Sequence, residues 1–303
     1  DNHPVYPPKT PEEGYHVTED LVDRAIGFIS DLKSIYPNVP FFMYFAPGAM
    51  HFPHQEPKKY IEKYKGRFDV GWDVIRQQYF DRQLELGIIP EGTKLPPRNP
   101  GVRAWEEFGE NEKKFMCRLQ ETWAGFLAHT DEHLGRLIDY LASINQLDNT
   151  VIILTADNGT SQNGGPYGVT TLGPVPQRSA ANNGQTIAAF SGNPLPEEDF
   201  SNIDEILDDI GGPKSYADIP WGWSQVGNTP LRWYKHDTHG GGVRVPLIVQ
   251  YPEGIKDRGG IRNQFHHVSD ITPTILGMLG IEPKASYGGH TQMPISGTSL
   301  AYS

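Results

Sequence analysis

The residues best suited to chemistry in this chain follow a short apolar run. Val151 to Leu154 are four apolar residues in a row, which is typical of a strand buried on both faces. The run leads into Asp157-Asn158-Gly159, a sequence that favours a turn. A carboxylate and an amide oxygen at the carboxyl end of a strand suit calcium or magnesium. An ordinary surface turn would use the same three residues, and this stretch alone leaves both interpretations open.

A second group of polar residues follows another apolar run. Phe41 to Phe45 is predicted to be a buried strand, and it leads into a Pro/Gly-rich loop that holds His51 and His54. Two histidines three residues apart could belong to a site or could be ordinary loop residues. A zinc pair usually lies on a helix or beside cysteines, and neither condition is met here.

A lysine precedes a run of glycines in the third group. Lys235 is followed by His239 and by Gly240-Gly241-Gly242, where the backbone can approach a ligand closely. A lysine at such a position is a natural contact for an anion, although most lysines are simply solvated. The next apolar run, residues 246–251, is predicted to be another buried strand.

Helical periodicity accounts for much of the remaining chain. Thr18 is a plausible N-cap for the first helix, and Ser201 for a short acidic one. Helices are predicted for residues 18–32, 72–86, 112–144, 203–210 and 270–280. Three residues of the long helix, Cys117, His129 and His133, are interpreted as packing residues rather than ligands. The same holds for Trp221 and Trp223, although they could also line a pocket.

Composition narrows the class of protein. With 303 residues, 33 Gly and 26 Pro, the chain is predicted to be globular and rich in loops. A net charge of −11 argues against a nucleic-acid partner, and the single cysteine excludes an internal disulfide. We find no signal peptide and no apolar run of membrane-spanning length.

Taken in order, five segments resemble the sulfatase family of the alkaline-phosphatase-like superfamily, most closely its bacterial-type arylsulfatases. The matching segments are residues 41–54, 151–159, 228–246, 265–280 and 292–300, so the likeness covers about residues 15–303. The resemblance implies an α/β sandwich with a mostly parallel central sheet flanked by helices. Residues 1–303 would be the central and carboxyl portion of a single catalytic domain, with 1–14 a surface arm and 159–230 a loop-rich rim.

This resemblance also implies roles for five residues. Asp157 and Asn158 match the family's ligands of a divalent cation, for which calcium is expected more than magnesium. His51 and Lys235 match catalytic residues that also contact the sulfate, and His239 is expected to bind substrate. The chemistry is consistent, because a metal and a lysine offset the charge of a sulfate ester while a protonated histidine protonates the departing oxygen.

Two departures from the family pattern matter. Gly240 stands where the family usually has a glutamate after His239. The formylglycine motif, Cys/Ser-x-Pro/Ala-x-Arg, is absent, and the residues after Cys117 do not match it. We therefore expect the chain alone to be inactive and incompletely folded, and to need an amino-terminal segment of the same enzyme. Calcium takes six to eight oxygens, of which Asp157 and Asn158 would supply a minority.

The expected activity is hydrolysis of small-molecule sulfate monoesters, as in an arylsulfatase. A phosphonate or phosphate ester hydrolase of the same superfamily is the enzymatic alternative, since a metal, a histidine and a lysine serve either anion. A non-catalytic sulfatase-like remnant that binds anionic sugars or a protein is the alternative of another class. A periplasmic, secreted or lysosome-like location is implied by the family only.

Overall fold

The computed structural model describes residues 4–170 and 203–301, which belong to two units that are described separately. Unit 1 comprises residues 1–258 and unit 2 residues 259–303. The helices described in unit 1 are α1 (Val17–Ile35), α2 (Lys58–Glu62), α3 (Gly71–Glu85), the 3-10 helix η1 (Trp105–Glu107), α4 (Glu110–Ser143), α6 (Ile203–Ile206), α7 (Trp221–Gly227) and α8 (Gly240–Val243). Its strands are β1 (Ile152–Thr155) and β2 (Leu247–Gln250).

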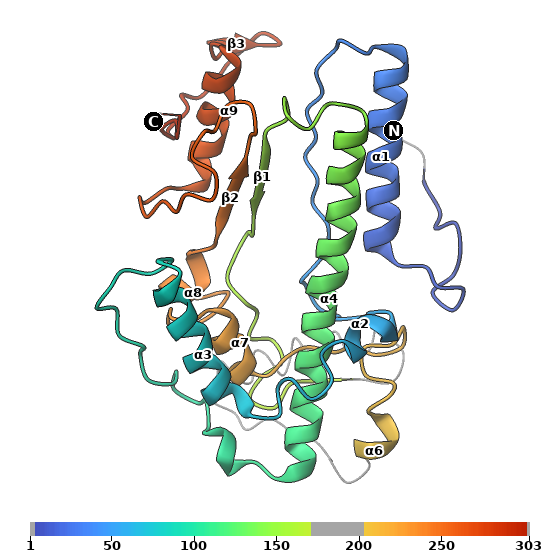
Figure 1. The fold of residues 1–303 in the computed structure, drawn as a ribbon, viewed down its shortest axis with the longest axis vertical. Helices are drawn as coiled ribbons and strands as arrows, with labels where there is room; N and C mark the ends of the chain where they lie inside the picture. The colour runs from blue at the N-terminus through green and yellow to red at the C-terminus, as the bar shows by residue number, and fades with distance from the viewer. Residues whose placement is uncertain (1–3, 171–202, 302–303) are drawn as a thin grey trace. The chain divides into compact units, whose positions relative to one another are not determined.

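Helix α4, with 34 residues, is the element on which much of unit 1 is built. It packs against α1 and α2, and Figure 1 shows α1 and α4 side by side. Residues 115–122 are all buried, so this part of the helix is enclosed on every side, whereas farther along the buried residues Phe126, His129 and His133 recur at helical spacing on one face. The helix predicted for residues 112–144 is confirmed, with a start two residues earlier. The helices predicted for 72–86 and 270–280 are confirmed as well, each within one residue.

The core of unit 1 is rich in tryptophan. The rings of Trp72 and Trp105 meet edge to face with centroids 4.7 Å apart, and Trp223 lies 5.7 Å from each of them. The indole N–H of Trp223 donates to the backbone oxygen of Met116 at 3.0 Å, so α7 is tied to α4. Cys117 lies in the same core. The interpretation of Trp223 and Cys117 as packing residues is confirmed.

The first helix begins differently from the prediction. It starts at Val17, and its N-cap is His16, whose Nδ1 accepts a hydrogen bond from the backbone N–H of Thr18 at 3.2 Å. Thr18 therefore lies inside the first turn. The prediction that Thr18 is the N-cap is wrong. The histidine ring supplies the acceptor that a threonine hydroxyl would otherwise provide.

Strands β1 and β2 pair antiparallel, with Ile152 opposite Gln250 and Thr155 opposite Leu247. No parallel pair occurs among the described residues, so the mostly parallel sheet is not seen in this part of the chain. The strands were also predicted to be buried on both faces, and that prediction is wrong here. Leu154 is 48% exposed and Ile248 58%, because each strand pairs only with the other among the residues that the structure describes.

The strand predicted for Phe41 to Phe45 is also wrong. These residues form no regular strand, and Phe42 and Tyr44 are 78% and 86% exposed. An apolar run of this kind becomes a strand only when a neighbour pairs with its backbone, and no such neighbour lies among the described residues. The segment ends in the loop that carries His51.

Unit 2 is small and contains η2 (Val268–Asp270), α9 (Ile271–Leu279) and a hairpin of β3 (Ser286–Tyr287) and β4 (His290–Thr291). Asp270 ties its tail to the start of α9. One carboxylate oxygen of Asp270 accepts from the backbone N–H of His267 at 2.9 Å, and the other from that of Thr298 at 2.8 Å. Gly280, with φ of 64°, ends the helix in the left-handed conformation.

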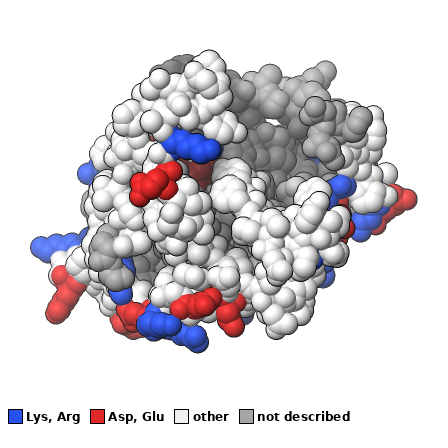
Figure 2. Space-filling view, turned by 90° about the horizontal axis from the view of Figure 1, so that it is seen from above, with Lys and Arg blue, Asp and Glu red and all other residues white. Residues whose placement is uncertain are grey.

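The surface carries no extended area of one charge in the view of Figure 2, where basic and acidic side chains are scattered. Residues 4–14 are exposed and have no regular structure apart from turns. Within the rim segment 159–230, helices α6 and α7 are described, whereas residues 171–202, including the expected cap Ser201, lie outside the described residues. None of the described helices combines the length and apolar character needed to cross a membrane.

Candidate active site

The loop after β1 carries the two expected metal ligands. Asp157 is exposed and Asn158 is half-buried, two and three residues beyond the end of the strand. The amide nitrogen of Asn158 donates to the backbone oxygen of Gly159 at 3.2 Å, which orients the side chain. Both residues lie just beyond the carboxyl end of β1, as the sequence predicted, and their role as metal ligands stays a prediction.

Gly159 brings this loop into backbone contact with the run of glycines. Its N–H donates to the backbone oxygen of Gly242 at 3.0 Å. A β-carbon placed on Gly159 would lie 1.6 Å from the backbone oxygen of Gly241, so no other residue fits. The close approach expected at Gly240–Gly242 is therefore to another loop of the same chain.

Lys235 joins the same group of loops. Its backbone N–H donates to the oxygen of Thr160 at 3.1 Å, and Gln162 donates to the oxygen of Lys235 at 3.2 Å. Asn228 holds both segments: its side-chain oxygen accepts from the N–H of Thr160 at 2.9 Å, and its amide nitrogen donates to Trp233 at 3.0 Å. The structure thus brings the Asp157 loop and the lysine segment together.

His239 lies at the edge of this group and is exposed. Its ring Nδ1 and its backbone N–H both contact the Oδ1 of Asp237. The backbone hydrogen bond from His239 is the main cause that holds the pKa of Asp237 below its usual range, with the ring adding to it. Asp237 therefore stays ionised and fixes the orientation of the imidazole.

The structure connects His51 to this group only indirectly. Its Nδ1 lies 2.8 Å from the oxygen of Phe52, and the two rings stack with centroids 4.6 Å apart. The loop is anchored by His54, whose N–H donates to the oxygen of Ala217 at 2.9 Å. Among the described residues no hydrogen bond or ion pair joins His51 to Lys235 or Asp157.

A buried pair behind the loop was not predicted as a pair. His54 and Asp218 are 2% and 1% exposed, and Nε2 of the histidine lies 3.9 Å from Oδ1 of the aspartate. Burial lowers the pKa of His54 to about 4 and raises that of Asp218 to about 7, although Lys235 pulls the latter down. His54 was visible as the second histidine of its loop, whereas nothing in the sequence around Asp218 marks it as special.

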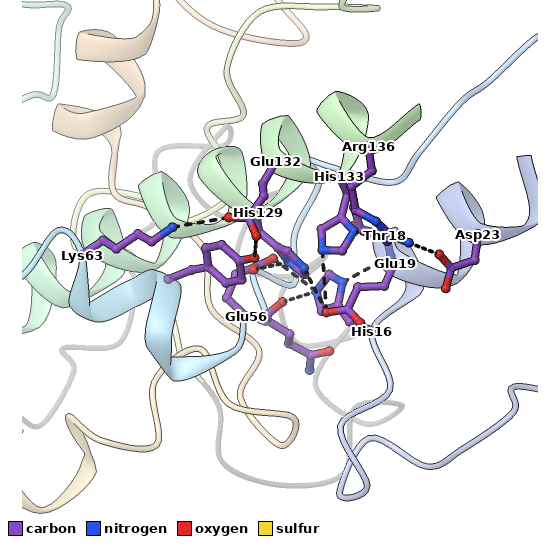
Figure 3. Close-up of polar contacts among 12 residues, drawn as sticks. His16, Thr18, Glu19, Asp23, Glu56, Lys63, His129, Glu132, His133 and Arg136 are labelled. Carbon is purple, nitrogen blue, oxygen red and sulfur yellow. Dashed lines mark hydrogen bonds and ion pairs between the residues drawn. The ribbon is translucent and has the colours of Figure 1, made fainter. Parts of the chain in front are cut away.

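Three histidines and two glutamates form a polar cluster between α1, α4 and the chain before α2 (Figure 3). We call it the His129 cluster; its members are His16, Glu19, Glu56, His129 and His133. His129 is fully buried, with Nδ1 2.7 Å from Glu56 and Nε2 3.3 Å from Glu19. The charge and hydrogen bonding of Glu56 outweigh burial, the largest single effect, and raise the pKa of His16.

The ring nitrogens of this cluster argue against a metal site. A ligating histidine needs a lone pair on the metal side and usually donates its other N–H. Nδ1 of His16 accepts from Thr18 and Nδ1 of His133 accepts from Arg136 at 2.8 Å, so the hydrogen-bond network assigns both protons to Nε2. Each of the two three-residue sets that could hold an ion contains either His16 or His133, and the ring atom that faces the set is Nε2. Because that atom carries the proton, it has no lone pair to give to a metal. The cluster is a hydrogen-bonded clamp of α1 on α4, which agrees with interpreting His129 and His133 as packing residues.

The chain is similar in sequence to known proteins, and this similarity shows its family. The family model described as Sulfatase matches residues 1–281. The chain belongs to the sulfatase family. An uncharacterised sulfatase of Schizosaccharomyces pombe is 35% identical over 249 residues, covering 82% of this sulfatase chain and 41% of the yeast protein. An arylsulfatase of Klebsiella aerogenes is 26% identical over 271 residues, covering 89% of this chain and 53% of the bacterial protein.

The sulfatase chain thus spans about half the length, or less, of these two relatives. Among solved structures, Ps i-CgsB in complex with k-i-k-neocarrahexaose is 19% identical, with a TM-score of 0.46, and covers 94% of this chain and 37% of that one.

Proposed function

We propose that this chain is the central and carboxyl part of a metal-dependent sulfatase that hydrolyses sulfate monoesters, aryl sulfates among them. The proposal rests on one observation in this member of the sulfatase family. The loop after β1, the segment that carries Lys235 and the run of glycines at 240–242 are in backbone contact. Gly159 touches Gly241 and Gly242, and the backbone of Lys235 is bonded to that of Thr160, which supports a single site for the expected metal ligands and the lysine.

His51, Lys235 and His239 have separate tasks in this proposal. Lys235 neutralises a non-bridging oxygen of the sulfate, where negative charge is concentrated. His51, exposed at the end of its loop, protonates the departing ester oxygen. His239, fixed by Asp237, donates a second hydrogen bond to the sulfate.

Asp157 and Asn158 fit a hard cation such as calcium, because both offer oxygen and one is an exposed carboxylate. The cation would offset the charge of the sulfate. Calcium takes six to eight oxygens, so most of its ligands come from elsewhere. Lys235 is not one of them, since an ammonium has no lone pair to give.

The remaining ligands and the nucleophile are proposed to come from an amino-terminal segment of the same enzyme. The exposed apolar residues of β1 and β2 support this, since Leu154 and Ile248 are 48% and 58% exposed. A further strand beside them would bury these side chains and pair the free backbone edge. The Cys/Ser-x-Pro/Ala-x-Arg motif, absent from these 303 residues, belongs in that segment.

The test is hydrolysis of p-nitrophenyl sulfate by the native protein. Replacing His51 or Lys235 by Ala is expected to lower kcat/KM by about 100- to 1,000-fold, since each group acts on charge that grows in the transition state. The matched controls are His290→Ala and Lys256→Ala, which change exposed residues of the same types. Both should keep the wild-type rate.

Two results would contradict the proposal. Full activity in His51→Ala and Lys235→Ala would remove both residues from the site. Faster hydrolysis of p-nitrophenyl phosphate than of the sulfate, lost in the same variants, would assign the chain to the phosphate ester hydrolases instead. A native protein that binds but hydrolyses neither ester would be a non-catalytic member of the family.

A further inference from the structure

Trp233 holds a backbone conformation that a bulky residue rarely adopts. Its φ is 66°, in the left-handed region, where the β-carbon of an ordinary residue crowds the neighbouring backbone. Glycine would adopt this conformation without that cost. The chain nevertheless has a tryptophan here, two residues before Lys235. Strain of this kind persists only where the surrounding structure enforces it, and such positions are concentrated at functional sites.

The backbone of Trp233 is held from three sides. Its N–H donates to the side-chain oxygen of Asn99 at 3.2 Å, and its oxygen accepts from the amide nitrogen of Asn228 at 3.0 Å. On the third side lies the run of glycines, since a β-carbon on Gly241 would be 2.0 Å from the oxygen of Trp233. Gly241 is also the residue that Gly159 contacts. Trp233 is therefore anchored to the loops that form the candidate active site.

The indole of Trp233 lies beside His239. The two rings are tilted at 53° to each other with centroids 6.1 Å apart, and His239 is exposed. Trp233 itself is half-buried, so part of it remains open to solvent. Because His239 donates to the sulfate in the proposed function, a ring attached to that sulfate comes within reach of the indole.

The tryptophans of the core differ from Trp233. Trp72 and Trp223 are 2% and 1% exposed, and their indole N–H groups donate to backbone oxygens at 3.2 Å and 3.0 Å. Among the described residues Trp233 forms hydrogen bonds only through its backbone, and it lies outside the core cluster. Core packing therefore does not explain why position 233 carries an indole.

We propose that Trp233 is a specificity-determining residue whose indole packs against the ring that carries the sulfate in the substrate. This inference rests on the proposed function, in which Lys235 and His239 bind the sulfate itself. An indole offers a large, rigid apolar surface that favours contact with another ring. Two kinds of sulfate ester present such a surface, an aryl sulfate and a sugar with the sulfate on its ring.

The first experiment measures the binding of two sulfonates to the native protein. A sulfonate carries the negative charge of a sulfate ester, but its C–S bond leaves no ester bond to hydrolyse. Benzenesulfonate has a ring and methanesulfonate has none. Calorimetric titration at constant ionic strength is expected to give benzenesulfonate a dissociation constant about 5-fold lower than that of methanesulfonate.

Trp233→Asn removes the ring but suits the backbone, because asparagine tolerates a positive φ. The variant should bind benzenesulfonate no better than methanesulfonate, and its affinity for methanesulfonate should equal that of the wild type. Trp233→Phe keeps a ring and should keep most of the preference. The matched control is His236→Asn, which changes an exposed residue with φ of 74° on the other side of Lys235. This control should leave both affinities unchanged.

The second experiment identifies the kind of ring. KM and kcat of the wild type and Trp233→Asn are measured with p-nitrophenyl sulfate and with glucose 3-sulfate. A contact that is equal in the bound substrate and the transition state changes KM alone, so we expect a rise in KM of about 5-fold with kcat unchanged. A rise for p-nitrophenyl sulfate assigns the contact to an aryl ring, and a rise for glucose 3-sulfate assigns it to a sugar ring.

Three results would overturn the proposal. The first is a wild type without a preference for benzenesulfonate, or the same preference in Trp233→Asn. The second is a variant that loses affinity for both sulfonates alike, since Trp233 would then act only through the fold. The third is an unchanged KM for both esters. An active sulfatase with any of these results keeps the proposed function and loses this role of Trp233.

Failure of the proposed function gives a different result. A native protein that hydrolyses no sulfate ester is not a working sulfatase, and the sulfonate titrations then decide the role of Trp233 without any turnover. Loss of the preference for benzenesulfonate in Trp233→Asn, with the affinity for methanesulfonate intact, would support the ring contact even in that protein.

Discussion

At the scale of the residue, burial has opposite effects on the two members of the His54–Asp218 pair. The folded state holds His54 neutral, with its pKa lowered to about 4, so the stability it contributes is present at neutral pH and is lost as the pH falls. The pKa of Asp218 is raised to about 7, so its contribution is present in acid and is lost as the pH rises. Between about pH 4 and pH 6.5 the two slopes largely cancel.

Asp218→Asn is expected to reveal how His54 makes the free energy of unfolding depend on pH. The variant keeps the hydrogen bond from Ile219 but no longer takes up a proton, so only the slope of His54 remains. Its free energy of unfolding should fall from pH 7 to pH 5 by on the order of 2 kcal/mol more than that of the wild type. Urea denaturation at the two pH values measures this difference.

The matched control is Asp131→Asn, which changes an exposed aspartate on α4. Its dependence on pH should follow the wild type. Parallel curves for Asp218→Asn and the wild type would show that the carboxyl group of Asp218 has the same proton affinity in the folded and unfolded chain.

The residues of the candidate site were predictable to different degrees. Asp157, Lys235 and His51 follow or precede apolar runs or glycines that are visible in the sequence, and the resemblance to sulfatases gave them roles. Asp218 carries no such signal. Its properties arise from its burial beside His54, a residue far away in the chain, and local patterns do not contain that information.

At the scale of the element, helices followed the sequence much more closely than strands did. The periodic pattern that predicts α4 lies entirely within its own 34 residues, because helix hydrogen bonds join residues that are close together in the chain. A strand needs a partner. Residues 41–45 have the composition of a strand, but no other segment pairs with them among the described residues. The pairing of β1 with β2 joins residues almost a hundred positions apart, which composition does not reveal.

Two glycines of α4 test how closely α2 approaches it. A β-carbon at Gly125 would lie 3.0 Å from the backbone of Tyr60 and Ile61, whereas one at Gly135 would meet nothing within 4 Å. Gly125→Ala is expected to destabilise the protein by about 1–3 kcal/mol. Gly135→Ala should stabilise it by about 0.5–1 kcal/mol, since alanine favours a helix.

Chemical denaturation of both variants and the wild type gives the two differences. The pair controls for helix propensity, because the same substitution is made twice in one helix. Equal effects at the two positions would mean that α2 can move away from α4 at no cost.

At the scale of the whole molecule, apolar strand surface is left uncovered in the described chain. Ile248 and Val249 are 58% and 38% exposed on β2, and Leu154 is 48% exposed on β1. Surfaces of this kind, beside a free strand edge, favour association with another strand. In the proposed enzyme the amino-terminal segment provides that strand.

The chain of residues 1–303 prepared by itself is therefore expected to self-associate through β2. Ile248→Lys should shift it towards the monomer, because a charge on an edge strand opposes pairing. Sedimentation velocity over a range of concentrations measures the shift. Val5→Lys, which changes an apolar residue that is 64% exposed in the amino-terminal arm, is the control and should leave association unchanged. Equal association of all three proteins would place the contact elsewhere.

The contact between Gly159 and Gly241 bears on how this site can be re-engineered. Since a β-carbon on Gly159 would lie 1.6 Å from the oxygen of Gly241, the two loops form one interlocking part. Grafting residues 157–160 alone onto another sulfatase scaffold would fail unless the backbone of the opposite loop already approached the graft as closely as Gly241 does here. A designer who wishes to exchange substrate preference must transplant both loops together, with the lysine segment that lies between them in the chain.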